Sequence, residues 1–477
     1  MTDRRFYVTT AIPYVNGDPH LGHALELVQA DVLARHRRLR GDEVRFLSGT
    51  DDNALKNVDA ALAAGRPVAE FVAEKAERFV ELARLLQLSN DDFIRTSTDP
   101  RHRPGVERLW LACAARGDLY ERDYEGLYCR GCEAFVDGSC PEHAEPPERV
   151  VERNWFFRLS RYRDELLGLL ESGSLGVEPE HRRNEVLAFV RGGLADLSVS
   201  RPQQRARGWG IPVPGDPTQV VYVWFDALAN YVTALGGPAY ETWWCRSDER
   251  LHLIGKGIVR FHAVYWPAIL LSAGRPLPTA IFVHDYLTAE GYKLSKSAGT
   301  AIDPVEVVAR YGADALRWWF VRDVPRAGDA DVRPDAIAAR ANELANGLGN
   351  LVNRTIALAG DSPAGPSPPE GARLEALCRD LPGTIDRALA AFDLRAAAGA
   401  LWDVVAEANR FVSATKPWEA ADRSGLIAVL LHACETVARE LSPFLPHAAS
   451  RIEQALVERD TRRGRALFAK ADAATTG

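Results

Sequence analysis

The chain has 477 residues, of which 47% are apolar and 26% charged, and its formal net charge is −7. This composition is typical of a globular protein, the length predicts several domains, and no apolar run is long enough to cross a membrane. The acidic balance gives no general affinity for nucleic acid, so an RNA ligand would need local basic patches. The candidates for such patches are Arg201–Arg207 and the stretch that contains Arg317, Arg322 and Arg326.

The first predicted elements are a strand over Phe6–Ala11 and a helix over 20–37 that begins with His20, Leu21, Gly22 and His23. The two imidazoles lie one turn apart at the start of a helix that follows a strand, which is where open α/β sheets bind ligands. A helix N-terminus favours phosphate through its unpaired N–H groups and its dipole. Gly22 carries no side chain, so an adenine ring could lie against the backbone.

Three of the seven cysteines form a cluster with one histidine: Cys129-x2-Cys132 is followed by Cys140-x2-His143. Two such pairs are typical of a structural zinc site, in which four sulfur and nitrogen ligands surround the metal as a tetrahedron. The alternative is two unrelated cysteine turns in an insertion. The remaining cysteines are isolated, and no signal peptide is apparent at the N-terminus, so we expect a cytoplasmic protein without a disulfide framework.

The middle of the chain returns to alternating strands and helices. Apolar runs predict strands over Val220–Phe225 and Ala280–Val283, with a helix over Ile258–Ala273 between them. The loop Lys293-Leu294-Ser295-Lys296-Ser297 follows, although only seven of the 58 basic residues in the chain are lysines. Two ammonium groups on a loop could clamp a departing pyrophosphate. The alternative is a solvated basic loop.

From about residue 336 the pattern becomes helical. Leu344, Leu348, Leu351 and Ile356 recur at helical spacing, and a Pro/Gly-rich loop over Gly360–Gly371 separates this helix from a further helical block. We therefore expect an all-helical C-terminal domain.

The histidine and lysine motifs stand about 270 residues apart, and together they resemble the two signatures of the class I aminoacyl-tRNA synthetases. Within that class the chain is similar to the methionyl-tRNA synthetases along nearly its whole length. The resemblance implies a Rossmann-like α/β catalytic domain, with a zinc-knuckle connective insertion, followed by an all-α anticodon-binding bundle. The expected boundaries are 1–115 and 206–275 for the two catalytic halves, 116–205 for the insertion, 276–335 for the lysine-motif region and 336–477 for the bundle.

The resemblance also implies roles for individual residues. ATP, carried with Mg²⁺, would be bound at Gly22 and by the catalytic residues His20, His23, Lys293 and Lys296, and zinc by Cys129, Cys132, Cys140 and His143. Asn350 and Arg354, four residues apart on one helix face, and Trp418, at the start of a helix-like segment, would recognise the CAU anticodon of tRNA(Met) by hydrogen bonds and stacking. Neither a membrane nor DNA is an expected partner. Methionine would be bound by Asp51, through its ammonium group, and by Ala11, Ile12, Tyr14, Trp224, Ala227, Leu228, Tyr231, Ile258 and His262.

The chain departs from the family pattern at three places near the expected site. It has Asn53-Ala54 where His-Gly is usual, Gly257 where Asp is usual and Asp285 where Gly is usual. These departures leave open an alternative function, in which a relative of specialised metabolism adenylates an amino acid and transfers it to a small amine or hydroxyl without tRNA. A non-catalytic tRNA-binding module is a third possibility.

Overall fold

The structure is a computed structural model that describes residues 4–129, 134–136, 138–140, 145–289, 291–293, 302–360, 365–459 and 467–468. The chain forms two compact units, and each is described by itself. The first unit comprises Met1–Pro19, Arg40–Leu82 and Ser89–His284, and the second comprises His20–Leu39, Ala83–Leu88 and Asp285–Gly477. This division is coarser than the five predicted domains, whose boundaries stay predictions.

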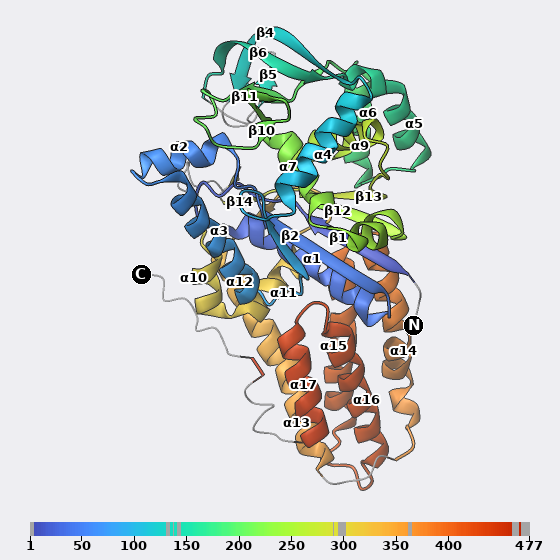
Figure 1. The fold of residues 1–477 in the computed structure, drawn as a ribbon. Helices are drawn as coiled ribbons and strands as arrows, with labels where there is room; N and C mark the ends of the chain where they lie inside the picture. The colour runs from blue at the N-terminus through green and yellow to red at the C-terminus, as the bar shows by residue number, and fades with distance from the viewer. Residues whose placement is uncertain are drawn as a thin grey trace. The chain divides into compact units, whose positions relative to one another are not determined.

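The first unit is built on a six-stranded parallel sheet with the strand order β3-β2-β1-β12-β13-β7 (Figure 1). β1 is rich in β-branched and aromatic residues and is buried along nearly its whole length, as is usual for a strand inside a parallel sheet. The chain continues to one side of β1 through β2 and β3 and returns to the other side through β12 and β13. β1 and β12 therefore flank a topological switch point, where doubly wound sheets bind ligands. The strands are β1 Arg5–Thr10, β2 Glu43–Thr50, β3 Asp92–Arg95, β7 Gly176–Glu178, β12 Glu249–Gly255 and β13 Ala280–His284.

Most helices of this unit pack around a large hydrophobic core that contains several aromatic rings. α4 packs against α7 and α9, and Trp110, Trp244 and Trp266 are almost fully buried in the same cluster. Rings of this size bury much apolar area and stabilise the unit. The helices are α2 Leu55–Ala63, α3 Val68–Leu85, α4 His102–Ala115, α5 Arg163–Ser172, α6 Glu180–Arg191, α7 Val223–Thr233, the short α8 Pro238–Tyr240 and α9 Trp266–Ser272.

Antiparallel strands interrupt the parallel sheet in the sequence between β3 and β12. β4 and β6 form a long antiparallel pair, with β5 beside β4 and β8 beside β6. A smaller sheet has the order β10-β11-β9. These strands lie in and just after the predicted insertion. Their bounds are β4 Leu119–Cys129, β5 Ala134–Val136, β6 Glu148–Phe157, β8 Leu197–Ser198, β9 Ser200–Pro202, β10 Pro212–Val213 and β11 Asp216–Val221.

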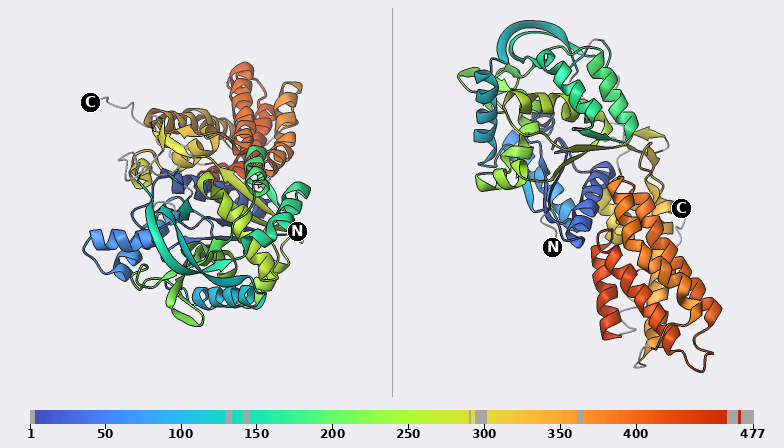
Figure 2. Two further views of the ribbon diagram at one scale, coloured as in Figure 1. Left: turned by 90° about the horizontal axis from the view of Figure 1, so that it is seen from above. Right: turned by 90° about the vertical axis from the view of Figure 1, so that its right-hand side faces the viewer.

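The second unit is largely helical, as expected from the sequence after residue 336. In the bundle α14 packs against α15 and α16, and α16 packs against α17 (Figure 2). Side-chain caps mark two helix starts: Asp303 accepts from the N–H of Val305 in α10, and Asp393 accepts from that of Ala396 in α15. The helices are α1 Leu21–Leu39, α10 Pro304–Tyr311, α11 Ala313–Asp323, α12 Pro334–Glu343, α13 Asn350–Ala359, α14 Ala372–Ala390, α15 Leu394–Thr415, α16 Ser424–Leu441 and α17 Pro446–Glu458, with short strands β14 Leu287–Ala289, β15 Tyr292–Lys293 and β16 Ala330–Asp331.

The prediction of surface basic patches is wrong for two of its arginines. Arg317 is fully buried inside the second unit, where its guanidinium pairs with Asp31 of α1 at 2.7 Å and donates to the carbonyl oxygens of Leu86, Pro443 and Phe444. Burial lowers the pKa of this guanidinium, and the Asp31 carboxylate opposes that shift. The residue joins α1 to the turn between α16 and α17 and is not available to a ligand.

Arg201 is also buried, in the first unit, where its guanidinium stacks on the rings of Tyr128 and Tyr222.

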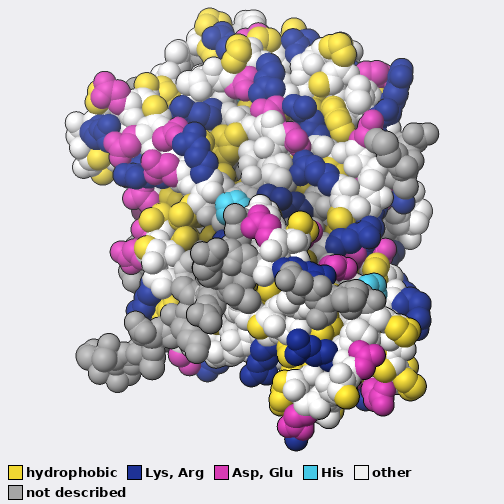
Figure 3. Space-filling model, turned by 90° about the horizontal axis from the view of Figure 1, so that it is seen from below, with side chains coloured by type: hydrophobic (Ala, Val, Ile, Leu, Met, Phe, Trp, Pro, Cys, Tyr) yellow, Lys and Arg dark blue, Asp and Glu magenta, His cyan; other side chains and the backbone are white. Residues whose placement is uncertain are grey.

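On the face of the molecule in Figure 3, basic and acidic side chains are interspersed. No helix among the described residues is both long enough and apolar enough to cross a membrane.

Candidate functional site

A small cavity in the first unit lies where β1, β2 and β12 end. Residues that follow these strands contribute one part of its wall, and α7 contributes another. The structure brings nine of the ten residues predicted for the amino-acid site around this one cavity: Ala11, Ile12, Asp51, Trp224, Ala227, Leu228, Tyr231, Ile258 and His262. The tenth, Tyr14, does not line the cavity, but its ring packs edge-on against Trp224 with centroids 6.3 Å apart.

α7 supplies four of these residues because Trp224, Ala227, Leu228 and Tyr231 share one helix face at spacings of three and four residues. The predicted strand over Val220–Phe225 is therefore wrong in its second half. β11 ends at Val221, and α7 begins at Val223. A short apolar run does not distinguish a buried strand from a buried helix, and this run contains both.

Two buried, neutral histidines lie in and behind the aromatic wall of the cavity. His262 Nδ1 lies 3.0 Å from the carbonyl oxygen of Ile258, which can only accept, so Nδ1 carries the proton and Nε2 accepts from the hydroxyl of Tyr231 at 2.7 Å. Burial lowers the pKa of His262 to about 4. Behind Tyr231, the ring of His252 is also neutral, because burial holds its pKa well below the usual range.

Asp51 is the carboxylate of this cavity. It follows β2 and is 1% exposed, and its position is fixed by its own N–H, which donates to the carbonyl of Pro13 at 2.9 Å. The amide of Asn57 donates to its carbonyl oxygen at 2.8 Å, and the backbone N–H of Asn53 donates to its Oδ1 at 3.2 Å. A carboxylate at this depth suits a cationic ligand.

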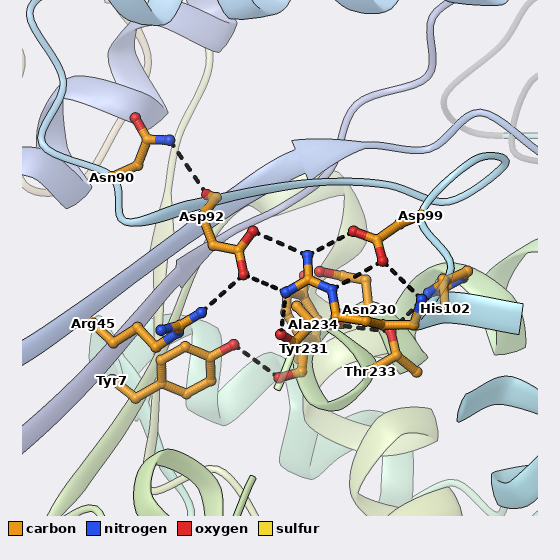
Figure 4. A network of polar contacts seen from close by, with 11 residues as sticks. Tyr7, Arg45, Asn90, Asp92, Asp99, His102, Asn230, Tyr231, Thr233 and Ala234 are labelled. Atoms are coloured by element: carbon orange, nitrogen blue, oxygen red, sulfur yellow. Dashed lines mark hydrogen bonds and ion pairs between the residues drawn. The ribbon is translucent and has the colours of Figure 1, made fainter. Parts of the chain in front are cut away.

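The far end of α7 is held by a polar network that Figure 4 shows. Arg101 donates to the carbonyl of Ala234 at 2.7 Å and forms ion pairs with Asp92 and Asp99 at 2.8 and 2.6 Å. These carboxylates raise the pKa of the guanidinium. The hydroxyl of Tyr7, on β1, donates to the carbonyl of Tyr231 at 2.8 Å. The network therefore ties the helix that forms one wall of the cavity to the central sheet.

A second buried polar network, absent from the sequence prediction, contacts the first turn and the last residue of α7. Asp226 is 1% exposed, and its two oxygens accept from His102 Nε2 at 2.5 Å and from the Asn53 side-chain amide at 2.7 Å. The other nitrogen of His102, Nδ1, lies 2.7 Å from the hydroxyl of Thr233. His102 and Asp226 are 124 residues apart, so no local motif signals their contact.

The histidine pair lies in the second unit, at the start of α1. The rings of His20 and His23 are stacked, with centroids 3.8 Å apart. His20 Nδ1 accepts from the N–H of Gly22 at 3.1 Å, and His23 Nδ1 accepts from the N–H of His20 at 3.2 Å. In the neutral tautomer each Nε2 therefore carries the proton, which suits donation to a phosphate oxygen. A Cβ on Gly22 would lie only 2.9 Å from the His20 ring, so glycine is needed here for the ring itself.

The predicted lysine loop is described only at its beginning. Lys293 belongs to β15, which pairs with β14, while its side chain and Lys296 lie outside the described residues. The carboxylate of Asp331 fixes the hairpin by accepting from the hydroxyl of Thr288 at 3.0 Å and from the N–H of Gly291 at 3.2 Å. Asp285, one of the family departures, accepts from the N–H of Gly328 at 2.6 Å and so has a structural partner.

Two of the four predicted zinc ligands are described. Cys129 ends β4 and Cys140 follows β5, and both thiols are buried. Cys132 and His143 lie outside the described residues. Within the described part of the chain no group of three potential ligands meets, so the prediction of a zinc site stays a prediction.

The residues predicted to recognise an anticodon are exposed on the second unit. Asn350 and Arg354 lie one turn apart on the solvent face of α13. Trp418 is 56% exposed, which is unusual for so large an apolar ring. The prediction that it begins a helix is wrong: it lies in the turn between α15 and α16, after Lys416 has ended α15 in a left-handed conformation.

A doubly wound parallel sheet, a pocket at its switch point and a histidine pair at a helix start are features of nucleotide-using α/β enzymes. A model of the family "tRNA synthetases class I (M)" matches residues 6–149 and 137–356. The chain is 41% identical to the methionine–tRNA ligase of Brucella suis biovar 1, over 95% of this chain and 92% of that protein. It is also 41% identical to the methionine–tRNA ligase of Rhizobium meliloti, over 94% and 90%.

Among solved structures, the chain is similar to Mycobacterium tuberculosis methionyl-tRNA synthetase in complex with methionyl-adenylate. The TM-score is 0.89 at 37% identity, and the match covers 99% of both chains. The chain belongs to the class I tRNA synthetases of the methionine type.

Proposed function

We propose that this chain is a methionine–tRNA ligase. Methionine and ATP form methionyl-adenylate and pyrophosphate, and the methionyl group then passes to the terminal ribose of tRNA(Met). The observation that carries this proposal is the cavity of the first unit, where one buried carboxylate lies within a largely apolar and aromatic wall. Two relatives are named methionine–tRNA ligases, and each is 41% identical to the chain over at least 94% of its length.

The cavity accounts for both ends of the amino acid. Asp51 pairs with the substrate ammonium, and the side chain extends along α7 toward Tyr231 and His262. A thioether is apolar and polarisable, and it packs well against aromatic rings. Because burial keeps His262 neutral, the wall presents no positive charge to the thioether at physiological pH.

The two motifs act on the triphosphate. His20 and His23 hold it through their Nε2–H groups, and the stacking of the rings above Gly22 keeps both in one orientation. Lys293 and Lys296 neutralise the charge that develops on the departing pyrophosphate. Mg²⁺, bound together with ATP, would supply positive charge to the phosphate oxygens.

A structural zinc ion would be held by Cys129, Cys132, Cys140 and His143 in the connective insertion. What supports this is the spacing of the four residues together with the burial of the two thiols that the structure describes, since soft sulfur donors suit zinc. At the other end of the chain, exposed Asn350, Arg354 and Trp418 recognise the CAU anticodon. We place the enzyme in the cytoplasm, with the five domains bounded as predicted from the sequence.

The test is an assay of the parent protein with methionine, ATP and total tRNA. The expected result is methionine-dependent pyrophosphate exchange together with charging of tRNA(Met). Robust exchange without charged tRNA would overturn the ligase function in favour of transfer to a small amine or hydroxyl. Binding of tRNA without any exchange would indicate a non-catalytic tRNA-binding module.

A further inference from the structure

Asn53 connects the carboxylate of the amino-acid site to the helix that forms its wall. Its backbone N–H donates to Asp51 Oδ1 at 3.2 Å, while its side-chain amide donates to Asp226 Oδ2 at 2.7 Å. Asp51 lines the cavity, and Asp226 stands on α7 immediately before Ala227, which lines it as well. Asn53 therefore bridges the carboxylate of the cavity and the helix that forms part of the cavity wall.

The neighbour of Asn53 contacts the same helix. Ala54 is fully buried and packs in one cluster with Tyr222 and Val223, the residues at which α7 begins. The two positions where the chain has Asn-Ala and the family usually has His-Gly thus both contact α7. Both residues of this departure therefore belong to the contact between the segment after β2 and the start of α7.

Asp226 has a defined partner on each side. One oxygen accepts from His102 on α4, and the other accepts from the amide of Asn53. A buried carboxylate that loses a donor pays the desolvation cost of the unpaired oxygen, so its helix shifts to regain a partner. The far end of α7 is fixed by Arg101 and Tyr7. In its first turn Asp226 is held from α4 by His102 and from the segment that follows β2 by Asn53.

We propose that Asn53 is a positioning residue for the amino-acid site: it fixes the distance between Asp51 and the α7 wall and thereby sets the affinity for the amino acid. This inference rests on the proposed function, because it uses the cavity as the methionine site. Asn53 does not itself line the cavity. Its effect should therefore appear in the KM for methionine and not in the KM for ATP.

The experiment exchanges the two partners. In Asn53→Asp two carboxylates face each other, and we expect the KM for methionine in pyrophosphate exchange to rise on the order of tenfold or more, with the KM for ATP unchanged. In the double variant Asn53→Asp/Asp226→Asn, the amide introduced at position 226 can donate to the carboxylate introduced at position 53, while its oxygen accepts from His102. We expect this double variant to recover most of the loss.

Asn57→Asp is the matched control. Asn57 is buried, lies in the adjoining helix α2 and donates to the Asp51 carbonyl, but it has no hydrogen bond to Asp226 in the described contacts. Combined with Asp226→Asn, it should show no rescue. Hydrogen exchange of peptides over 223–233 should rise in Asn53→Asp and return toward the parent rate in the exchanged double variant.

Each outcome has one meaning. Equal changes in both KM values, an unchanged methionine KM in Asn53→Asp, or equal rescue in the Asn57 control would overturn the positioning role while leaving the proposed function intact. A parent protein that exchanges no pyrophosphate with methionine would overturn the proposed function, and this inference would fall with it.

Discussion

His262 gives the structure a pH dependence whose sign and size follow from its burial. Its pKa is lowered from 6.5 to about 4 in the folded protein. Between these two values the unfolded chain binds more protons than the folded one, so stability is complete above pH 6.5 and is lost as the pH falls toward 4. At pH 5 this single group removes about 2 kcal/mol of the free energy of unfolding.

The matched variant is His262→Gln. A glutamine amide can donate to the Ile258 carbonyl and accept from the Tyr231 hydroxyl, as the imidazole does, but it does not titrate. We expect the difference in the free energy of unfolding between parent and variant to change by about 2 kcal/mol in favour of the variant between about pH 7.5 and about pH 5. His252 is present in both proteins, and because its pKa is lowered mainly by its own burial and only secondarily by His262, most of its effect cancels.

Two measurements check this reasoning. Denaturant unfolding followed by tryptophan fluorescence gives the difference at each pH, and an NMR titration of the histidine ring protons, assigned by comparison with the variant, gives the pKa directly. A His262 resonance that titrates near the ordinary histidine value, or a stability difference that does not change with pH, would refute the effect of burial on this group.

The remaining predictions concern the nucleotide, metal and RNA sites. Lys296→Ala should slow adenylate formation on the order of 10²-fold, measured in single turnovers, with a much smaller change in ATP binding, because its charge acts mainly as pyrophosphate develops; a change confined to the KM for ATP would contradict this. Cys132→Ser should lower the zinc content from near one per chain by elemental analysis, whereas Cys245→Ser, outside the cluster, should retain it; full metal in the first variant would disprove the ligand set. Trp418→Ala should reduce aminoacylation of tRNA with a CAU anticodon by about one to two powers of ten, because it removes the ring on which an anticodon base would stack. Pyrophosphate exchange should stay unchanged, and a parallel fall in exchange would indicate a folding defect.

The sequence was most informative where function depends on residue types in fixed local patterns. The residues around the amino-acid cavity come from four separate segments, yet nine of the ten predicted from the family resemblance line it. The same patterns did not reveal where α7 begins, since apolar residues at the end of β11 and the start of a buried helix look alike.

Long-range polar contacts were beyond the reach of sequence patterns. Nothing local in the sequence pairs His102 with Asp226 or buries Arg317 against Asp31. The sequence does not distinguish a buried arginine from an exposed one, because its burial depends on how distant helices pack. The contact with Asp226 gives the departure at Asn53 a structural partner that the sequence alone could not show.

The helix that carries Asn350 and Arg354 contains an uneven turn. α12 and α13 are joined without interruption by a π-helical segment over Leu344–Gly349. Each turn of a π-helix holds more residues than a turn of α-helix. A π-helical residue advances by less than the roughly 100° of an α-helical residue, so an α-helix would reach the same direction with about one residue fewer. Deletion of one residue here would let the segment rewind as α-helix, with Asn350 and Arg354 still on the solvent face and Leu351 and Val352 still in the core. The same deletion inside α13, which is regular α-helix, would rotate every later side chain by about 100°.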